Sequence, residues 1–374
     1  MIELSDRSLF TPVRGAHAQS GVTIYVLNRK VAPVQQSFYF TNDGMSADGR
    51  YLWFYCAFPP SGSADQGRTL GVVDFVDHAV RHFPETQFTD ASPYVDHATG
   101  DAYWGMGAHL WRRSPASNGH VEHINALPDA IIGARAVPTL ATHLTRSADG
   151  KAFFADARIG LQYVFGSLPV DGSPWQEWMR FDRYHNHAQF SPTDPDTVLF
   201  AQEMHDDPLT GLTFPITNRL WLMRRGEIPR AILKEPRWVS HEWWDANGRH
   251  VWCVWENETW RVDIETGEEE RIAFPRRCWH SHSSQDGQMI VGDSNSGFRR
   301  GCPSTLHFMN RHTGRVITLV ENPERSDYTG RTYHIDPHPR FCCADQYIVF
   351  TTTILGDVDV AIIPVSELVS LTSH

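Results

Sequence analysis

The chain has 374 residues, of which 41% are hydrophobic and 21% are charged, and its formal net charge at pH 7 is −11. This composition is ordinary for a globular protein, while the acidic balance argues against a nucleic-acid partner, which usually meets a basic surface. No run of about 18 apolar residues is present, so no membrane span is expected. An anionic ligand would have to find positive charge locally, on arginine, protonated histidine or a metal.

The N-terminal stretch and the cysteines bear on location. Glu3, Asp6 and Arg7 interrupt the first residues, which lack the apolar core of a signal peptide. The six cysteines show no CxxC spacing, and several lie in apolar runs. We therefore expect reduced, buried cysteines and a cytoplasmic protein; a leader removed earlier would instead make it secreted or periplasmic.

Short strands bounded by Gly, Asp and Asn follow one another along the chain, with only short helical turns, as at 366–371. The first strand is expected at 21–29. A unit of one tight turn and one apolar strand then recurs. Its seven copies are SADGRYLWFYCA from Ser46, HATGDAYWGM from His97, SADGKAFFADA from Ser147, SPTDPDTVLFAQE from Ser191, DANGRHVWCVWE from Asp245, SQDGQMIVGD from Ser284 and CADQYIVFTT from Cys343.

This repeat predicts an all-β fold. A second strand often follows each unit, and the units recur roughly every 40 to 58 residues, which is typical of four-stranded blades. The sequence therefore predicts a seven-bladed β-propeller, with residues 1–374 as a single domain. We expect strand 21–29 to pair with the last blade near Ile362, because this closes the ring and leaves no free sheet edge there.

Histidines recur at one position relative to these turns. The five register histidines are His143, His187, His241, His280 and, with one residue of slack, His338. The first two units carry Asn42 and Pro93 there. In a propeller this position lies on or just before the innermost strand, so five consecutive blades would aim an imidazole at the central channel. One such histidine is usually structural, but a ring of them indicates a functional site, since imidazole is a common metal ligand and general base.

Several stretches resemble propeller-type polysaccharide lyases. HNHAQFSP, ITNRLW, SHEWW and HPRF are similar to blade motifs of oligogalacturonate lyases, whereas APVQQSFYFTNDGMSADGRYLWFYCAFPPSG, GRTLGVVDF and RHFPETQF look closer to ulvan lyases. The resemblance covers most of the chain. It implies cleavage of a uronate-containing glycan by β-elimination to a 4,5-unsaturated uronate. Ulvan-type rhamnosyl-glucuronate linkages are favoured, with oligogalacturonate lyase activity as the alternative.

Such chemistry needs a cation on the carboxylate, a base at C5 and an acid for the leaving oxygen. The resemblance to ulvan-type enzymes implies a histidine pair, matched by His123 and His143, and a tyrosine, matched by Tyr184. Arg219 matches the basic residue of the oligogalacturonate lyase pattern and is expected to clamp the carboxylate. His143 or Tyr184 is expected to be the base, and the other residue or His123 the acid.

A divalent metal is also expected, held by three register histidines of adjacent blades: His241, His280 and His338. Oligogalacturonate lyases bind manganese with a Gln-His-His set in the last blade, but YHIDPHPRF lacks the Gln and has Asp336 in place of one histidine. Ulvan-type relatives bind zinc with His and Cys ligands, and Cys278 and His282 flank His280. These residues favour zinc over manganese; a metal-free channel is the alternative.

The expected partner is an anionic uronate saccharide, contacted by His187 and Arg340, with no nucleic acid or membrane, and the protein is expected to be a monomer or homodimer. A non-catalytic binding scaffold is a competing reading, although partner surfaces favour Tyr, Trp and Arg over buried imidazoles. A hydrolase or metal-dependent lactonase is another. A glycoside hydrolase would need two opposed carboxylates, and the register positions carry none.

Overall fold

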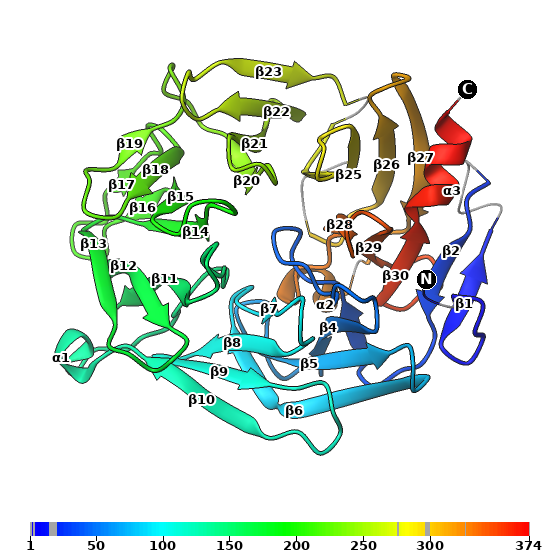
Figure 1. Cartoon of the computed structure of the whole chain (residues 1–374), viewed down its shortest axis with the longest axis horizontal. Coiled ribbons are helices and arrows are strands. Elements are labelled where there is room, and N and C mark those ends of the chain that lie inside the picture. Colours follow the sequence, from blue (N-terminus) through cyan, green and yellow to red (C-terminus); the bar gives the residue numbers. More distant parts are fainter. Residues whose placement is uncertain are drawn as a thin grey trace.

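The computed structural model describes residues 2, 4–14, 21–274, 277–295, 300–325 and 327–373. Within these ranges the strands form seven antiparallel blades around a central channel, and one separate two-stranded hairpin (Figure 1). The predicted all-β class and the seven-bladed propeller are confirmed.

Each blade begins with its innermost strand. Blade 1 comprises β3 (Val34–Gln36), β4 (Tyr51–Ala57), β5 (Gln66–Asp74) and β6 (Ala79–Thr89). Blade 2 comprises β7 (Tyr94–Val95), β8 (Ala102–Met106), β9 (His109–Arg113) and β10 (Val121–Ala126). Blade 3 comprises β11 (Ala152–Ile159), β12 (Gln162–Pro169) and β13 (Gln176–Phe181). Two isolated bridges, Thr139 to Arg158 and Arg146 to Phe153, occupy the inner edge of blade 3.

The next three blades continue the pattern. Blade 4 comprises β14 (His185–Phe190), β15 (Thr197–Gln202), β18 (Leu220–Arg224) and β19 (Arg230–Ala231). Blade 5 comprises β20 (Ser240–Trp244), β21 (His250–Trp255), β22 (Glu258–Asp263) and β23 (Glu269–Ile272). Blade 6 comprises β24 (His280–Ser283), β25 (Met289–Asn295), β26 (Ser304–Asn310) and β27 (Arg315–Asn322). The hairpin of β16 (His205–Asp206) and β17 (Thr213–Phe214) is inserted in blade 4.

The last blade joins both ends of the described chain. Its strands, from the channel outwards, are β28 (Arg340–Cys342), β29 (Tyr347–Thr352), β30 (Asp359–Pro364), β2 (Ile24–Leu27) and β1 (Phe10–Val13). Tyr25 of β2 lies opposite Ile362 of β30, the pairing expected from the sequence. The edge of β30 is therefore covered, and β1 adds a fifth strand outside it.

The recurring Ser-x-Asp-Gly turn has one hydrogen-bond pattern wherever it occurs. The serine hydroxyl donates to the aspartate two residues later, and the glycine adopts a positive φ that other residues rarely tolerate. The pairs are Ser46–Asp48, Ser147–Asp149 and Ser284–Asp286, at 2.6, 2.7 and 2.6 Å. These local bonds explain why the motif marks the start of a strand.

The core lies between neighbouring blades. One cluster of buried apolar side chains fills each of the seven blade interfaces of the described chain. Phe54 of blade 1 shares a cluster with Val349 of blade 7, for example, and Val291 of blade 6 shares one with Phe350. Because both faces of each blade are buried, strands read as nearly continuous apolar runs.

The described helices are short: α1 (Asp129–Ile132), α2 (Tyr328–Thr332) and α3 (Val365–Thr372). The sequence indicated only a turn at 366–371, but α3 is a two-turn helix, because Val365, Leu368 and Thr372 form one buried face against blades 6 and 7. Among the described residues, no helix has the length and apolar character needed to span a bilayer.

Candidate functional site

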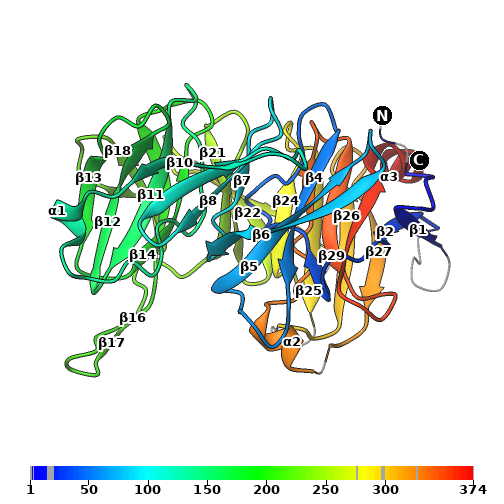
Figure 2. The same cartoon turned by 90° about the horizontal axis from the view of Figure 1, so that it is seen from below.

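A cavity of about 500 Å³ opens at one end of the central channel. It is lined by the segments that lead into innermost strands, and by the connections β4–β5, β15–β18 and β25–β26. Hairpin β16–β17 and helix α2 project from this same face (Figure 2). The opposite mouth holds a second cavity, of about 530 Å³, lined by the turns that follow the innermost strands.

The structure brings the five register histidines together. The rings of His143, His187, His241 and His338 line the first cavity. His280 lies behind them with 0% exposure, its ring centroid 4.3 Å from that of His241 and 4.2 Å from that of His338. The shared offset from the turn therefore corresponds to a shared place around the channel.

Backbone irregularities turn some of these rings inwards. His187, His241 and His338 have φ angles of 53°, 53° and 45°, in the left-handed region. The β14–β15 pairing shifts register between Asn186 and Gln189, and an equivalent shift surrounds His241 in β20. A residue other than glycine pays roughly 1–2 kcal/mol in this conformation, and such residues concentrate at functional sites. Each bulge redirects one imidazole towards the channel.

Four side chains on one wall could hold a metal ion. The ligand atoms of His280, His334, Asp336 and His338 all lie within 4.8 Å of one another. Nε2 of His280 and Nε2 of His338 are buried and have no hydrogen-bond partner among the described residues, while His334 Nε2 lies 2.9 Å from an Asp336 carboxylate oxygen. Three imidazoles and one carboxylate suit a divalent transition metal. His241 lies beside this group but is not one of its four members.

Asp293 orients two members of this metal-type group. Its Oδ2 accepts a hydrogen bond from His280 Nδ1 at 2.9 Å and another from the His338 backbone N–H at 3.2 Å. Its Oδ1 accepts from the His280 backbone N–H at 2.9 Å. With Nδ1 engaged, Nε2 of His280 is the nitrogen left for a ligand, an arrangement typical of metal-binding histidines.

The opposite wall carries a hydrogen-bonded histidine pair. Nε2 of His143 lies 2.9 Å from Nδ1 of His187. Burial lowers the pKa of His187 to about 3 and holds the pKa of His143 well below its usual value. Both rings are therefore neutral at neutral pH, with one N–H donated to the other ring. Asp156 supports the pair from beneath, accepting from the backbone N–H groups of Thr142 (2.7 Å) and Ala188 (3.2 Å).

Arg219, the predicted carboxylate clamp, lines the cavity but is held by two acidic residues of the protein. Its Nη1 lies 2.5 Å from Glu203 Oε1, and its Nε lies 3.1 Å from Glu242 Oε2. Nη2 adds a longer contact of 3.4 Å to Glu242. Its charge is thus largely neutralised within the protein, which disfavours the predicted role as the main clamp.

Tyr39 is the aromatic residue at the centre of the site. Its ring stacks on His143 with a centroid separation of 4.8 Å and an interplanar angle of 15°, and it also lies 4.8 Å from the His338 ring. It therefore touches both walls. Burial raises its pKa, so the hydroxyl is protonated. Tyr184, the predicted tyrosine, also lines the cavity, but it stacks on Tyr163 and its hydroxyl accepts from Asn186.

Two predicted residues lie elsewhere. His123 is exposed on β10, the outermost strand of blade 2, where its Nε2 lies 3.1 Å from His109 Nδ1. Arg340 donates to the Phe40 carbonyl at 2.7 Å and lines the second cavity, not the first. The expected pairing of His123 with His143 and the expected substrate contact of Arg340 are therefore not found in this cavity.

The proposed zinc ligands beside His280 also separate. His282 lines the second cavity, because two residues along a strand advance about 6.6 Å towards the other mouth of the channel. Cys278 is buried, with its thiol directed at the His280 carbonyl at 3.2 Å. Neither residue belongs to the metal-type group, so the structure does not support the expected Cys-containing zinc site.

Sequence reasoning overlooked Tyr39, Asp156 and Asp293. Both aspartates interrupt otherwise apolar strands, in FADA and VGDS. A buried carboxylate in such a strand needs hydrogen-bond donors, which was a usable signal. Tyr39 lies among aromatics in QSFYFT and looks like a core residue.

No protein-family model matches the chain. A stretch of 197 residues is 24% identical to an oligogalacturonate lyase of Dickeya dadantii (strain 3937), covering 48% of this chain and 49% of that protein. Another of 194 residues is 23% identical to an oligogalacturonide lyase of Pectobacterium atrosepticum, covering 47% and 48%. The chain is thus matched over about half the length of these curated relatives.

Two solved structures share the whole fold. An oligogalacturonate lyase in complex with manganese has 17% identity and a TM-score of 0.73, over 95% of this chain and 96% of that one. An oligogalacturonate lyase from Vibrio parahaemolyticus has 16% identity and a TM-score of 0.73, over 96% and 97%. These likenesses establish the propeller architecture along nearly the whole chain.

Proposed function

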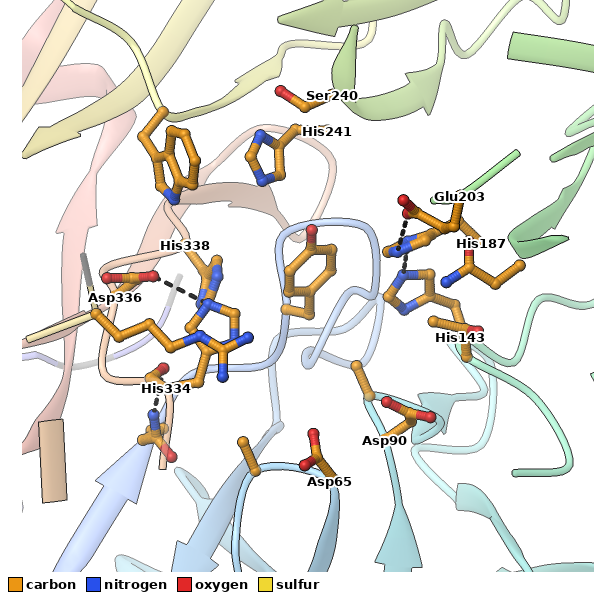
Figure 3. A pocket seen from close by; sticks show the side chains of 18 of the residues that line it. Asp65, Asp90, His143, His187, Glu203, Ser240, His241, His334, Asp336 and His338 are labelled. Carbon is orange, nitrogen blue, oxygen red and sulfur yellow. Dashed lines mark hydrogen bonds and ion pairs between the residues drawn. The ribbon is translucent and has the colours of Figure 1, made fainter. Parts of the chain in front are cut away.

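We propose that the protein is a lyase that cleaves uronate-containing oligosaccharides by β-elimination, with oligogalacturonides as the substrate class. The observation that carries the proposal is a single cavity in which a His-Asp metal-type group faces neutral imidazoles (Figure 3). The curated relatives named oligogalacturonate and oligogalacturonide lyase support this substrate over the ulvan-type linkage that the N-terminal motifs favoured.

The metal-type group fits the carboxylate of the sugar. A divalent ion bound by His280, His334, Asp336 and His338 would draw charge from a uronate carboxylate and make the C5 proton more acidic. Manganese is supported by the similar structure that holds it and by the carboxylate of Asp336, a hard ligand. The preference for zinc rested on Cys278 and His282, which lie outside the group.

We assign the base at C5 to His241. It lies beside the metal-type group, and within the described chain its Nδ1 is buried without a hydrogen-bond partner. Nε2 is then the nitrogen open to a substrate. Burial, followed by the charges of His280 and Arg219, holds the pKa of His241 well below the usual histidine value, so the ring is ready to accept a proton at neutral pH. His143, a base expected from the sequence, is only 1% exposed and is already hydrogen-bonded to His187.

Tyr39 supplies the proton for the leaving oxygen in this proposal. As His241 takes the proton from C5, the C–H electron pair forms the C4–C5 double bond and the C4–O bond breaks. The leaving oxygen takes the hydroxyl proton of Tyr39. After the products leave, His241 releases its proton to water and Tyr39 takes a proton from water, which restores both side chains. The raised pKa keeps Tyr39 protonated until that step.

An ultraviolet assay tests the function. The purified protein is incubated with oligogalacturonates, ulvan oligosaccharides and glucuronan, with and without manganese, and the conjugated double bond of the product is followed. We expect absorbance to rise with oligogalacturonates. His241→Ala should lower the rate by about 10²- to 10⁴-fold, whereas His123→Ala, outside the cavity, should leave it unchanged. No unsaturated product from any of the three substrates would refute the proposal.

A further inference from the structure

The cavity contains a buried guanidinium that forms no ion pair within the described part of the chain. Of the arginines that the structure describes, three line the cavity: Arg68, Arg219 and Arg300. Arg219 is paired with two glutamates, and Arg300 is exposed. Arg68 is 5% exposed and forms no ion pair with any residue in the described ranges. A charge removed from water without a partner is costly, so this position favours an anionic ligand.

Arg68 is held rigidly, but part of its hydrogen-bonding capacity is unused. Nη2 donates to the carbonyls of Ala64 (2.9 Å) and Asp90 (3.2 Å), and the guanidinium lies 4.2 Å from the centre of the Tyr55 ring. Nη1 has only a long contact, 3.5 Å, with Gln36 Oε1. Nε has no partner within the described chain. The side chain is thus held in place before a ligand binds, and the N–H groups of Nε and Nη1 remain for hydrogen bonds to that ligand.

This guanidinium lies beside the metal-type group. Gln36, which contacts Arg68, donates through Nε2 to the carbonyls of Tyr333 (3.1 Å) and His334 (3.2 Å). Asp90 and Asp65 line the same part of the cavity without forming an ion pair with Arg68, and the Asp90 carboxyl accepts from the Thr139 hydroxyl instead.

We propose that Arg68, rather than Arg219, is the arginine that binds the uronate carboxylate, together with the metal-type group. This inference rests on the proposed lyase function. An arginine presents N–H groups in the planar fork that a carboxylate fits, and it keeps its charge at all working pH values. A methyl ester removes the negative charge from the sugar, so Arg68 would make the cavity prefer free uronates over methyl-esterified ones.

Arg68→Gln tests this assignment, with Arg113→Gln as the matched control. Arg113 is also buried and lies over an aromatic ring, but it pairs with Glu85 outside the cavity. Wild-type protein and both variants are assayed with oligogalacturonates and with their methyl esters, and thermal unfolding monitors folding. We expect Arg68→Gln to lower kcat/KM on the free acid by on the order of 100-fold and to reduce the preference for the acid over the ester. Arg113→Gln should keep that preference.

The outcomes separate the two proposals. If the wild-type protein cleaves no uronate, the lyase function fails. If it cleaves the free acid and folded Arg68→Gln keeps the wild-type preference for acid over ester, the lyase function stands and the role of Arg68 is overturned. If Arg68→Gln does not fold, Arg68→Lys decides, since it keeps the charge but loses the planar fork. A kcat/KM on the free acid equal to that of the wild type in Arg68→Lys would then overturn the role, because the fork would not be needed.

Discussion

Nε2 of His143 lies 2.9 Å from Nδ1 of His187, across the boundary between blades 3 and 4. The two rings come from different blades. Asp156 links the backbone segments that carry them, because it accepts hydrogen bonds from the N–H of Thr142, next to His143, and from the N–H of Ala188, next to His187. The geometry of the pair therefore depends on one buried carboxylate beneath it.

Asp156→Ala should destabilise the protein and disturb this pair. The change leaves two buried backbone N–H groups without an acceptor, at about 1–3 kcal/mol each. Urea unfolding should show a lower free energy of unfolding, and kcat/KM on oligogalacturonates should fall in the folded protein. Asp182→Ala, at an exposed position, is the control and should change neither. Unaltered stability of Asp156→Ala would mean that the two bonds do not support the site.

Asp293→Asn should weaken metal binding. The amide keeps one acceptor oxygen and puts an NH2 donor in place of the other. It therefore cannot accept both at Oδ2, from His280 Nδ1 and the His338 N–H, and at Oδ1, from the His280 N–H, so the support of His280 is weakened. Loss of such a supporting partner typically costs about 10- to 100-fold in metal affinity. Titration calorimetry with manganese measures it directly, and Asp286→Asn, in an exposed turn of the same blade, serves as the control. Equal affinities in wild type and Asp293→Asn would contradict the assignment.

Acidification should destabilise the protein through its buried histidines. Burial lowers the pKa of His187 to about 3 and lowers that of His143 as well, whereas the unfolded chain has a histidine pKa near 6.5. Below about pH 6.5 the unfolded state therefore binds more protons, and the free energy of unfolding falls as the pH drops towards the folded values. Asp156, whose pKa burial raises to about 7, acts in the opposite direction.

A histidine variant isolates this effect. His187→Gln removes one histidine with a lowered pKa. The free energy of unfolding of this variant should therefore fall less steeply than that of the wild type between pH 6.5 and pH 5. Thermal unfolding across that range gives the difference. His120→Gln, on the surface, should keep the wild-type slope. Parallel curves for wild type and His187→Gln would show that His187 is not buried in the neutral form.

Ile24→Ala tests the closure of the ring. Ile24 lies on β2, is 0% exposed and packs in the cluster between blades 6 and 7. Truncating a buried isoleucine typically costs about 2–5 kcal/mol, and the loss should appear in denaturant unfolding. Ile228→Ala, at a position with 89% exposure, should stay within about 0.5 kcal/mol of the wild type. A small effect at Ile24 would mean that β2 contributes little to the last blade.

The sequence repeat was enough to predict most of the fold. The Ser-x-Asp-Gly turns and apolar strands mark blades because their bonds are local, and the constant histidine offset placed the rings at the channel. The sequence did not reveal the bulges at His187 and His241, since a left-handed histidine has no sequence signature of its own. The sequence also did not show the position of a residue along the channel axis, so it did not predict that His282 and Arg340 line the second cavity and not the first.

Parts of the site could not be predicted because the interacting side chains are far apart in the sequence. Arg219 was expected to be free to bind a substrate carboxylate, because Glu242 lies 23 residues away in the sequence. In the fold the two side chains form an ion pair. Arg68 looked like the ordinary start of a strand in RTLGVVDF. The fold buries it against Tyr55, and it forms no ion pair with a residue that the structure describes. Asp336 appeared to be a departure from a metal motif, whereas the structure places its carboxylate among three imidazoles.

The most direct measurement of the central claim is mass spectrometry of the products formed from a defined oligogalacturonate by wild-type protein supplied with manganese. Elimination predicts one fragment that is lighter by one water molecule than the matching saturated uronide and absorbs in the ultraviolet. His241→Ala should form this fragment about 10²- to 10⁴-fold more slowly. Two saturated fragments would indicate hydrolysis, and an intact substrate would indicate no cleavage; either result would contradict the account.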